Sequence, residues 1–190
     1  MRAAIAAAAA RIMAEDGIDD YAVAKRKAAR RLGAPATESL PANDEIASEL
    51  RAYQSLYQAD EQRQRIAGLR RHALDLMHEL AVFNPYLIGS ILDGTAGRQA
   101  EIELQLFPES GKQVEIQLLE RGLAFTARRQ RRFAGHRVHE ATVLAFDWRD
   151  CTVKLEVFDP RDERVALKTS LAGRVIERAG PAEVQALLDG

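Results

Sequence analysis

The chain has 190 residues, of which 47% are hydrophobic and 29% charged, and its formal net charge is −1. This length and composition predict a globular protein with one good core, or a core with a small helical appendage. The near-zero net charge argues against nucleic-acid binding by the whole surface, although local basic patches can still bind.

The cysteine content and the apolar runs bear on the compartment. The single cysteine, Cys151, excludes an internal disulfide and is compatible with a reducing cytoplasm. No apolar run approaches the ~20 residues that a membrane span requires. The alanines after Met1 are only weakly apolar and Arg11 interrupts them, so we do not expect a signal peptide. We expect a cytoplasmic protein that does not enter a membrane.

The first third of the chain is predicted to be helical. Its segments carry apolar residues at helical spacing, and aspartate, asparagine or glycine stands where a helix would begin or end. Two prolines mark a turn between the second and third helices. The predicted helices are Ala3 to Ala14 with Gly17 as the stop, Asp19 or Asp20 to Gly33, a helix beginning at Asn43 or Asp44, and Glu61 to about Ala81.

The second half changes to the periodicity of strands. Two hairpins are predicted, each made of two short apolar or alternating runs joined by turn residues. Arg121 to Arg129 is a further candidate strand. A short helix with proline in its first turn is expected at the C-terminus, Pro181 to Leu188. The predicted hairpins are Glu101–Phe107 with Lys112–Leu119, and Ala141–Trp148 with Cys151–Phe158 about Arg149 and Asp150. The fold class is therefore α+β, with a helical N-terminal region (1–60) followed by a mixed sheet with flanking helices (61–190).

The stretch from Pro85 to Phe107 combines the residues with the clearest chemical meaning. A short apolar run ends at Gly89-Ser90, a polar segment containing Gly94 and Thr95 follows, and the next strand carries Glu101 and Glu103. Strand alternation places these two glutamates on one face. Because adjacent carboxylates repel each other, a divalent metal ion is the usual compensation.

This order of parts resembles the nucleotidyltransferase superfamily, which has a polymerase-β-like fold. Members carry a Gly-Ser on a turn after the first strand and an acid-x-acid pair on the next strand. Here Gly89, Ser90, Gly94 and Thr95 match the GS-x-x-x-GT form. Glu101 and Glu103 match the acid pair, with Glu where most active members have Asp. The resemblance implies a nucleotidyltransferase-like domain over residues 61–190, a nucleoside triphosphate substrate, and Mg²⁺ or Mn²⁺ held by carboxylates in a two-metal mechanism.

The superfamily supplies a third acid from a later strand, and two residues are candidates for it here. Glu115 would lie opposite Leu106 if a hairpin turned at Ser110-Gly111. At about 3.4 Å per residue, that position is on the order of 10 Å along the strand from Glu103. Glu156, on the second hairpin, has no such restriction. We therefore prefer Glu156 as the third metal-binding and catalytic carboxylate.

A basic run extends from Arg121 to Arg137, with six arginines, no acidic residue, and Phe125 and Phe133 interleaved. Arginine binds phosphate with two parallel hydrogen bonds and stacks on bases, so the run could hold a triphosphate, through Arg128 and Arg129, or an RNA backbone. A second basic cluster, Lys25–Arg31, offers another RNA contact. The competing interpretation is a solvated surface or a charged edge strand.

Two functions of different classes follow. The first is a nucleotidyltransferase that acts on a hydroxyl acceptor, with RNA preferred and a small-molecule or protein hydroxyl left open. The second is a catalytically degenerate module that binds a nucleotide or RNA. Other readings have less support: the sequence after Gly33 is a poor recognition helix for a transcription factor. His72, His78, His136 and His139 lack zinc spacing, and no motif supplies a base for Cys151.

Overall fold

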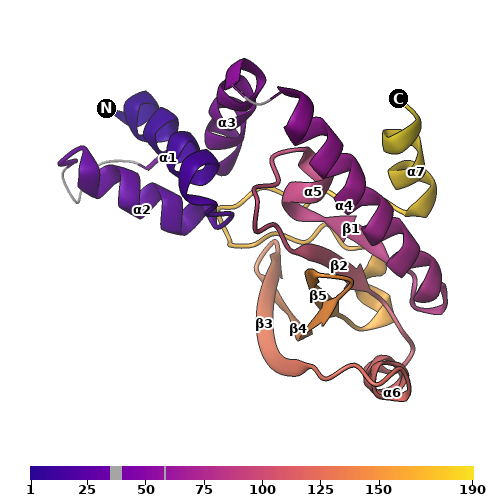
Figure 1. Cartoon of the computed structure of the whole chain (residues 1–190). Coiled ribbons are helices and arrows are strands. Elements are labelled where there is room, and N and C mark those ends of the chain that lie inside the picture. The colour runs from indigo at the N-terminus through magenta and orange to yellow at the C-terminus, as the bar shows by residue number, and fades with distance from the viewer. Residues whose placement is uncertain (35–39, 58) are drawn as a thin grey trace. The chain divides into compact units, whose positions relative to one another are not determined.

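A computed structural model describes residues 1–34, 40–57 and 59–190, and at positions 56, 57, 59 and 60 it describes the backbone alone. Helices fill the first third of the described chain and a five-stranded mixed sheet follows, so the predicted α+β class is confirmed (Figure 1). The helices are α1 (Arg2–Asp16), α2 (Tyr21–Arg31), α3 (Asn43–Tyr57), α4 (Ala59–Glu79), α5 (Gly89–Asp93), α6 (Gly111–Glu120) and α7 (Pro181–Asp189), with short 3₁₀ helices η1 (Ala81–Phe83) and η2 (Pro160–Arg164). The strands are β1 (Tyr86–Ile88), β2 (Ile102–Leu106), β3 (Thr126–Ala134), β4 (Arg137–Trp148) and β5 (Cys151–Val157).

The chain forms two compact units. Unit 1 comprises Met1–Ile66 and Asp93–Ala100, and unit 2 comprises Ala67–Leu92 and Glu101–Gly190. Helix α4 therefore contributes its first turns to unit 1 and the remainder to unit 2. Among the described residues, no helix is both long enough and apolar enough to cross a membrane.

Unit 1 is built on the packing of α1 against α2 and α3. The many alanines of α1 allow neighbouring helices to approach closely, and its larger residues fill the core. Helix α1 ends at Gly17 in the left-handed conformation, with φ of 69°. Helix α2 begins after Asp20, whose carboxylate accepts hydrogen bonds from the backbone N–H groups of Ala22 and Val23. Both predicted helix boundaries are confirmed. The core residues are Ile5, Ala6, Ala9, Ala10, Ile12, Met13, Ala24, Ala28, Ile46 and Leu50.

Unit 2 contains the sheet, with strand order β1-β2-β5-β4-β3. Strand β2 pairs antiparallel with β1 and parallel with β5, while β5-β4 and β4-β3 are antiparallel. The predicted hairpin about Arg149 and Asp150 is confirmed as the β4–β5 connection, and both residues have positive φ. The predicted C-terminal helix is confirmed as α7, with Pro181 in its first turn.

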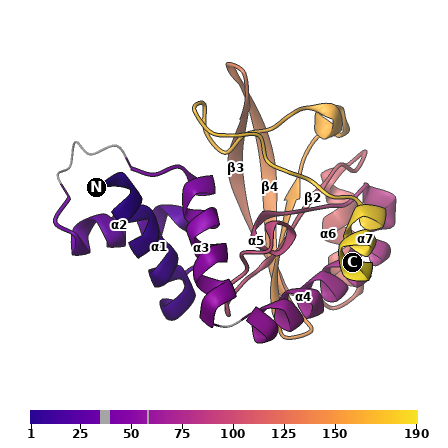
Figure 2. The same ribbon diagram turned by 90° about the horizontal axis from the view of Figure 1, so that it is seen from above.

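The two faces of this sheet differ in chemistry. One face is apolar and is packed against helices: the ring of His72 on α4 lies edge-on to Trp148, with 6.4 Å between ring centroids, and Gly111 of α6 lies beside Val157. In Figure 2, α6, α7 and the second half of α4 lie to one side of β3 and β4. The buried residues of the apolar face include Ile102, Leu104, Leu106, Leu144, Phe146, Val153, Leu155 and Val157. The opposite face carries the predicted carboxylates.

The prediction of a strand over Lys112–Leu119 was wrong, because this segment forms helix α6. Its alternating apolar residues fit either periodicity, but only the pair at helical spacing, Val114 and Leu118, is buried. Ile116, which a strand would have placed on the same face as that pair, is 53% exposed. The first predicted hairpin therefore does not exist, and Glu115 lies on a helix.

Candidate active site

The polar face of unit 2 is organised by the register between β2 and β5. Glu103 lies beside Lys154, and Gln105 lies beside Glu156. Side chains of directly paired residues point to the same face, and Glu101 reaches that face as well, because its carboxylate forms an ion pair with Lys154. The predicted shared face of the glutamate pair is thus present, and it includes a lysine.

Gly89 and Glu103 lie in contact across the β1–β2 pair. Gly89 follows β1, which pairs through Ile88 with Glu103. A Cβ at Gly89 would stand 3.2 Å from Oε1 of Glu103, so the carboxylate rests on the bare Cα of the glycine. Gly89 also has φ of 75°, a conformation that favours glycine. The structure therefore brings the Gly-Ser bend and one of the paired glutamates together.

Ser90 lies in the first turn of α5 and is 9% exposed. Helix α5 is anchored by Arg70 of α4, whose guanidinium donates hydrogen bonds to the carbonyl oxygens of Ile91 at 3.1 Å and Leu92 at 2.9 Å. These contacts satisfy carbonyl groups at the end of a short helix and hold the bend in place.

The environment of Glu103 disfavours its charged form. Burial raises the pKa of Glu103 to about 7, and the carboxylate of Glu156 adds to the effect, while Lys154 and Arg132 oppose it. Among the described residues, none forms a hydrogen bond or an ion pair with this carboxylate. Glu103 is therefore the member of the site whose charge an added cation would most strongly stabilise.

Glu156 is buried, with 3% of its surface exposed, and its carboxylate is fully engaged. Arg132 donates to both oxygens, through Nε at 3.2 Å and through a terminal nitrogen in a close ion pair. The side-chain amides of Gln105 and Gln130 donate at 2.9 and 3.4 Å. Gln105 in turn accepts a hydrogen bond of 2.6 Å from Arg178. Glu156, the preferred candidate for the third carboxylate, lies on the strand next to the glutamate pair, but its hydrogen-bond partners are protein donors.

Gly94 and Thr95, the second half of the predicted phosphate motif, belong to unit 1. Thr95 is 1% exposed, and its hydroxyl forms hydrogen bonds with Tyr21, at 3.0 Å, and with Asp93. Burial, with the charge of Asp93, raises the pKa of Tyr21 to about 12. Gly94 lines a cavity of about 260 Å³ within unit 1, together with Arg51, Gln54, Ser55, Gln62, Arg63 and Ile66.

The next residues of this loop are held by side chains of unit 1. The carboxylate of Asp19 accepts a hydrogen bond of 2.9 Å from the backbone N–H of Gly97. A Cβ at Gly97 would stand 2.6 Å from Oδ1 of the same carboxylate, so a larger residue there would displace the Asp19 side chain. The carbonyl oxygen of Ala96 accepts hydrogen bonds from Gln62 at 2.6 Å and Arg65 at 2.9 Å.

The arginine run is divided by strand alternation. On β3, Arg128 shares the polar face with Arg132, while Arg129 and Arg131 point to the other face, where Glu140 lies 3.8 and 3.9 Å away. Arg121 forms an ion pair with Glu79 at the ends of α6 and α4. The run follows an edge strand, as the competing interpretation expected. Arg128 and Arg137 are exposed, and no hydrogen bond or ion pair with the described residues engages their side chains.

The second basic cluster, Lys25–Arg31, lies on α2. Lys27 pairs with Asp16 at 2.7 Å, and Arg31 lies 3.9 Å from the same carboxylate. Arg26 and Arg30 are exposed. The cluster is therefore partly neutralised within unit 1.

The structure gives little support to a reactive cysteine or to a site of three metal-binding side chains. Sγ of Cys151 lies 3.6 Å from Nδ1 of His72, but burial raises the pKa of this thiol, which opposes a reactive thiolate. His139 pairs with Asp162 at 2.8 Å. Within residues 1–34, 40–57 and 59–190, no group of three His, Cys, Asp or Glu side chains is arranged to hold a metal ion.

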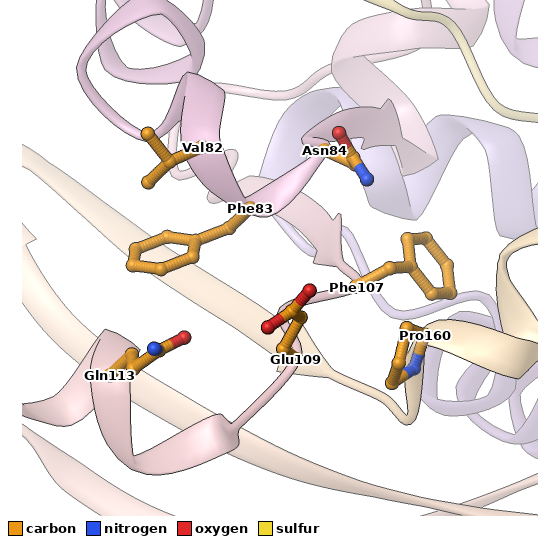
Figure 3. A pocket seen from close by; sticks show the side chains of 7 residues that line it. All are labelled: Val82, Phe83, Asn84, Phe107, Glu109, Gln113 and Pro160. Atoms are coloured by element: carbon orange, nitrogen blue, oxygen red, sulfur yellow. The ribbon is translucent and has the colours of Figure 1, made fainter.

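A separate cavity of about 490 Å³ lies where β2 leads into α6 (Figure 3). None of the predicted site residues lines it. Its walls come from η1 and the residue after it, from the segment between β2 and α6, from α6 and from η2, and Glu109 is the one charged side chain among them. The lining residues are Val82, Phe83, Asn84, Phe107, Glu109, Gln113 and Pro160.

The carboxylates of the polar face fit a Mg²⁺ ion that is also held by water and by substrate phosphates. Mg²⁺ is commonly held by one or two carboxylates together with water and substrate phosphates. Glu101 and Glu103 can supply two carboxylates, provided that the ion replaces Lys154 as the partner of Glu101. Glu156 does not fit as a third ligand in this arrangement, because Arg132 and two amides occupy its oxygens.

Four residues of the site were not predicted in these roles from the sequence: Lys154, Arg132, Gln105 and Gln130. The Lys-x-Glu alternation of β5 could have placed Lys154 and Glu156 on one face. No local pattern indicates that Arg132 reaches Glu156, because these two residues meet only when β3, β4 and β5 are paired in that order.

Comparison with known proteins finds no matching family model, no matching curated protein and no matching solved structure.

Proposed function

We propose that this protein transfers a nucleoside monophosphate from a nucleoside triphosphate to a hydroxyl acceptor, with RNA as the preferred acceptor. The observation that supports this proposal most directly is the contact between Gly89 and the carboxylate of Glu103. It places a carboxylate that forms no hydrogen bond or ion pair with the described residues beside the Gly-Ser bend. Mg²⁺ or Mn²⁺ would be held by Glu101 and Glu103.

Each part of the proposed site has a separate role. The carboxylate of Glu103 fills the place that a side chain at Gly89 would take, and the backbone of the bend and the hydroxyl of Ser90 can donate to phosphate oxygens. The metal ion, when bound, neutralises charge on the transferring phosphate and the leaving pyrophosphate. Lys154 provides a further positive charge beside Glu103. The acceptor hydroxyl loses its proton to solvent water, its oxygen forms a bond to the α-phosphorus, and the bond from that phosphorus to pyrophosphate breaks.

Arg128 is the arginine that best fits the triphosphate or the RNA backbone. It is exposed, lies on the polar face in the row of Val143 and Glu156, and forms no ion pair with the described residues. Arg129, its neighbour, points to the other face and lies near Glu140. Arg128→Ala should therefore weaken nucleotide or RNA binding more than Arg129→Ala does. Equal losses would show that the two faces contribute alike.

A second candidate function is a module that binds a nucleotide or RNA without catalysis. A specific observation favours it: Lys154 and Arg132 already neutralise two of the three carboxylates, Glu101 and Glu156. Internal cations of this kind can stabilise the face with no metal present. The substitution of Glu for Asp at the acid pair points in the same direction.

One experiment separates the two candidates. The protein is incubated with Mg²⁺ or Mn²⁺, each labelled nucleoside triphosphate, and total RNA. The proposal predicts label in RNA, which Glu103→Gln abolishes and Glu120→Gln, an exposed position on α6, leaves unchanged. Nucleotide binding without incorporation of label would support the module instead.

A further inference from the structure

The buried ion pair between Arg132 and Glu156 lies at the place where a third metal-binding carboxylate was expected. Arg132 is 8% exposed and Glu156 is 3% exposed, so both charges have left water. The carboxylate accepts from two nitrogens of the guanidinium and from two amides, which accounts for its acceptor capacity.

The sheet is shaped to admit this arginine. Arg132 is on β3 and Glu156 is on β5, so the guanidinium must cross β4 to reach the carboxylate. On the polar face of β4, the residues between them are Ala141 and Val143, which are small enough to leave a path. Gln130, which is paired with Ala141, crosses in the same way.

The pair is also tied to the C-terminal segment. Gln105, which is fully buried, donates to Glu156 and accepts from Arg178. Arg178 donates a second hydrogen bond, of 2.7 Å, to the carbonyl oxygen of Glu163, and its guanidinium lies 4.9 Å from the ring centroid of Phe107. Displacing Arg132 would therefore disturb a connected network.

We infer that Glu156 is the structural partner of Arg132 and not a metal ligand, and that the polar face binds one divalent cation, at Glu101 and Glu103, where a two-metal site would bind two. This inference rests on the proposed function and determines its metal count. A metal ion at Glu156 would have to expel Arg132 and leave a buried guanidinium without a partner, which is strongly unfavourable. The ion pair of Lys154 with Glu101 presents a smaller obstacle, because the two side chains are only partly buried, with 31% and 33% of their surface exposed.

The test counts bound Mn²⁺ by electron paramagnetic resonance, using the full chain with each of the four ribonucleoside triphosphates in non-hydrolysable form. The inference predicts one bound Mn²⁺ per chain. Two bound ions would overturn it and leave the proposed function intact. No bound ion with any analogue would overturn both the inference and the metal-dependent function.

A pair of variants gives a second, independent measurement. Glu156→Gln combined with Arg132→Met removes both buried charges together, which avoids an unpaired one. This double variant should bind one Mn²⁺ with a Kd within about twofold of the parent, whereas Glu103→Gln should raise the Kd at least about tenfold. If the double variant weakens Mn²⁺ binding as much as Glu103→Gln does, Glu156 is a metal ligand and the inference is wrong.

Discussion

Replacing Glu103 by glutamine should make the folded protein more stable at alkaline pH. Glutamine has nearly the shape of a protonated glutamate but carries no charge at any pH. In the folded protein, burial and the nearby carboxylate of Glu156 raise the pKa of Glu103 from 4.5 to about 7. The parent protein must therefore bear the cost of a charged, largely buried carboxylate above that pH, while the variant does not.

The sign and the size follow from linkage. Because the folded pKa of Glu103 exceeds the unfolded pKa, its contribution to stability is fully present below about pH 4.5 and is lost as the pH rises through about 7. At about 1.4 kcal/mol for each pH unit, the loss amounts to about 3 kcal/mol. The two proteins should have similar stability near pH 4.5, and Glu103→Gln should be more stable by about 3 kcal/mol at pH 8.

Urea unfolding, followed by tryptophan fluorescence, measures this difference. Trp148 is the single tryptophan and lies at the end of β4, so its signal reports on unit 2. Chelator is present throughout, so that no metal ion binds the face. Every other titrating group is common to both proteins, and the difference between them isolates Glu103. Equal stability at pH 8, or a variant that is less stable there, would refute the assigned environment of Glu103.

Three further outcomes are expected. Adding Mg²⁺ at pH 8 should raise the unfolding midpoint of the parent protein and leave that of Glu103→Gln unchanged, since ligands that bind the folded state stabilise it. Equal shifts of the two midpoints would place the ion elsewhere. Gly89→Ala should destabilise the protein by more than Gly122→Ala, because both glycines have positive φ but only the Cβ at Gly89 meets a side chain. The two positions share a backbone penalty of about 1 to 2 kcal/mol, and equal losses in urea unfolding would contradict the contact. Arg132→Ala should reduce the free energy of unfolding by about 3 to 5 kcal/mol. Combining it with Glu156→Gln should recover most of that loss, which a double-mutant cycle measures. Additive losses would exclude the buried pair.

The helices of the first third, helix α7 and the second hairpin could be predicted because their signals are local. A left-handed glycine ends α1, a capping aspartate begins α2, and the runs on both sides of Arg149 and Asp150 alternate as strands do. Helix α6 could not be predicted in this way. Val114, Ile116 and Leu118 alternate as in a strand, and only burial shows that the pair four residues apart faces the core.

The site could be predicted in part for the same reason. Alternation along one strand places Glu101 and Glu103 together. The contact of Glu103 with Gly89 depends on the register of β1 with β2, and the pairing of Arg132 with Glu156 depends on the order of three strands. These relations join residues that are far apart in the sequence, and strand pairing alone creates them.

Incorporation of label from a nucleoside triphosphate into RNA tests the central proposal most directly. With Mg²⁺ or Mn²⁺, the parent protein is predicted to label RNA from at least one of the four triphosphates, and Glu103→Gln is predicted to give no label while remaining folded. Labelling by Glu103→Gln at the parent rate, or no labelling by the parent with any triphosphate, would contradict the proposal.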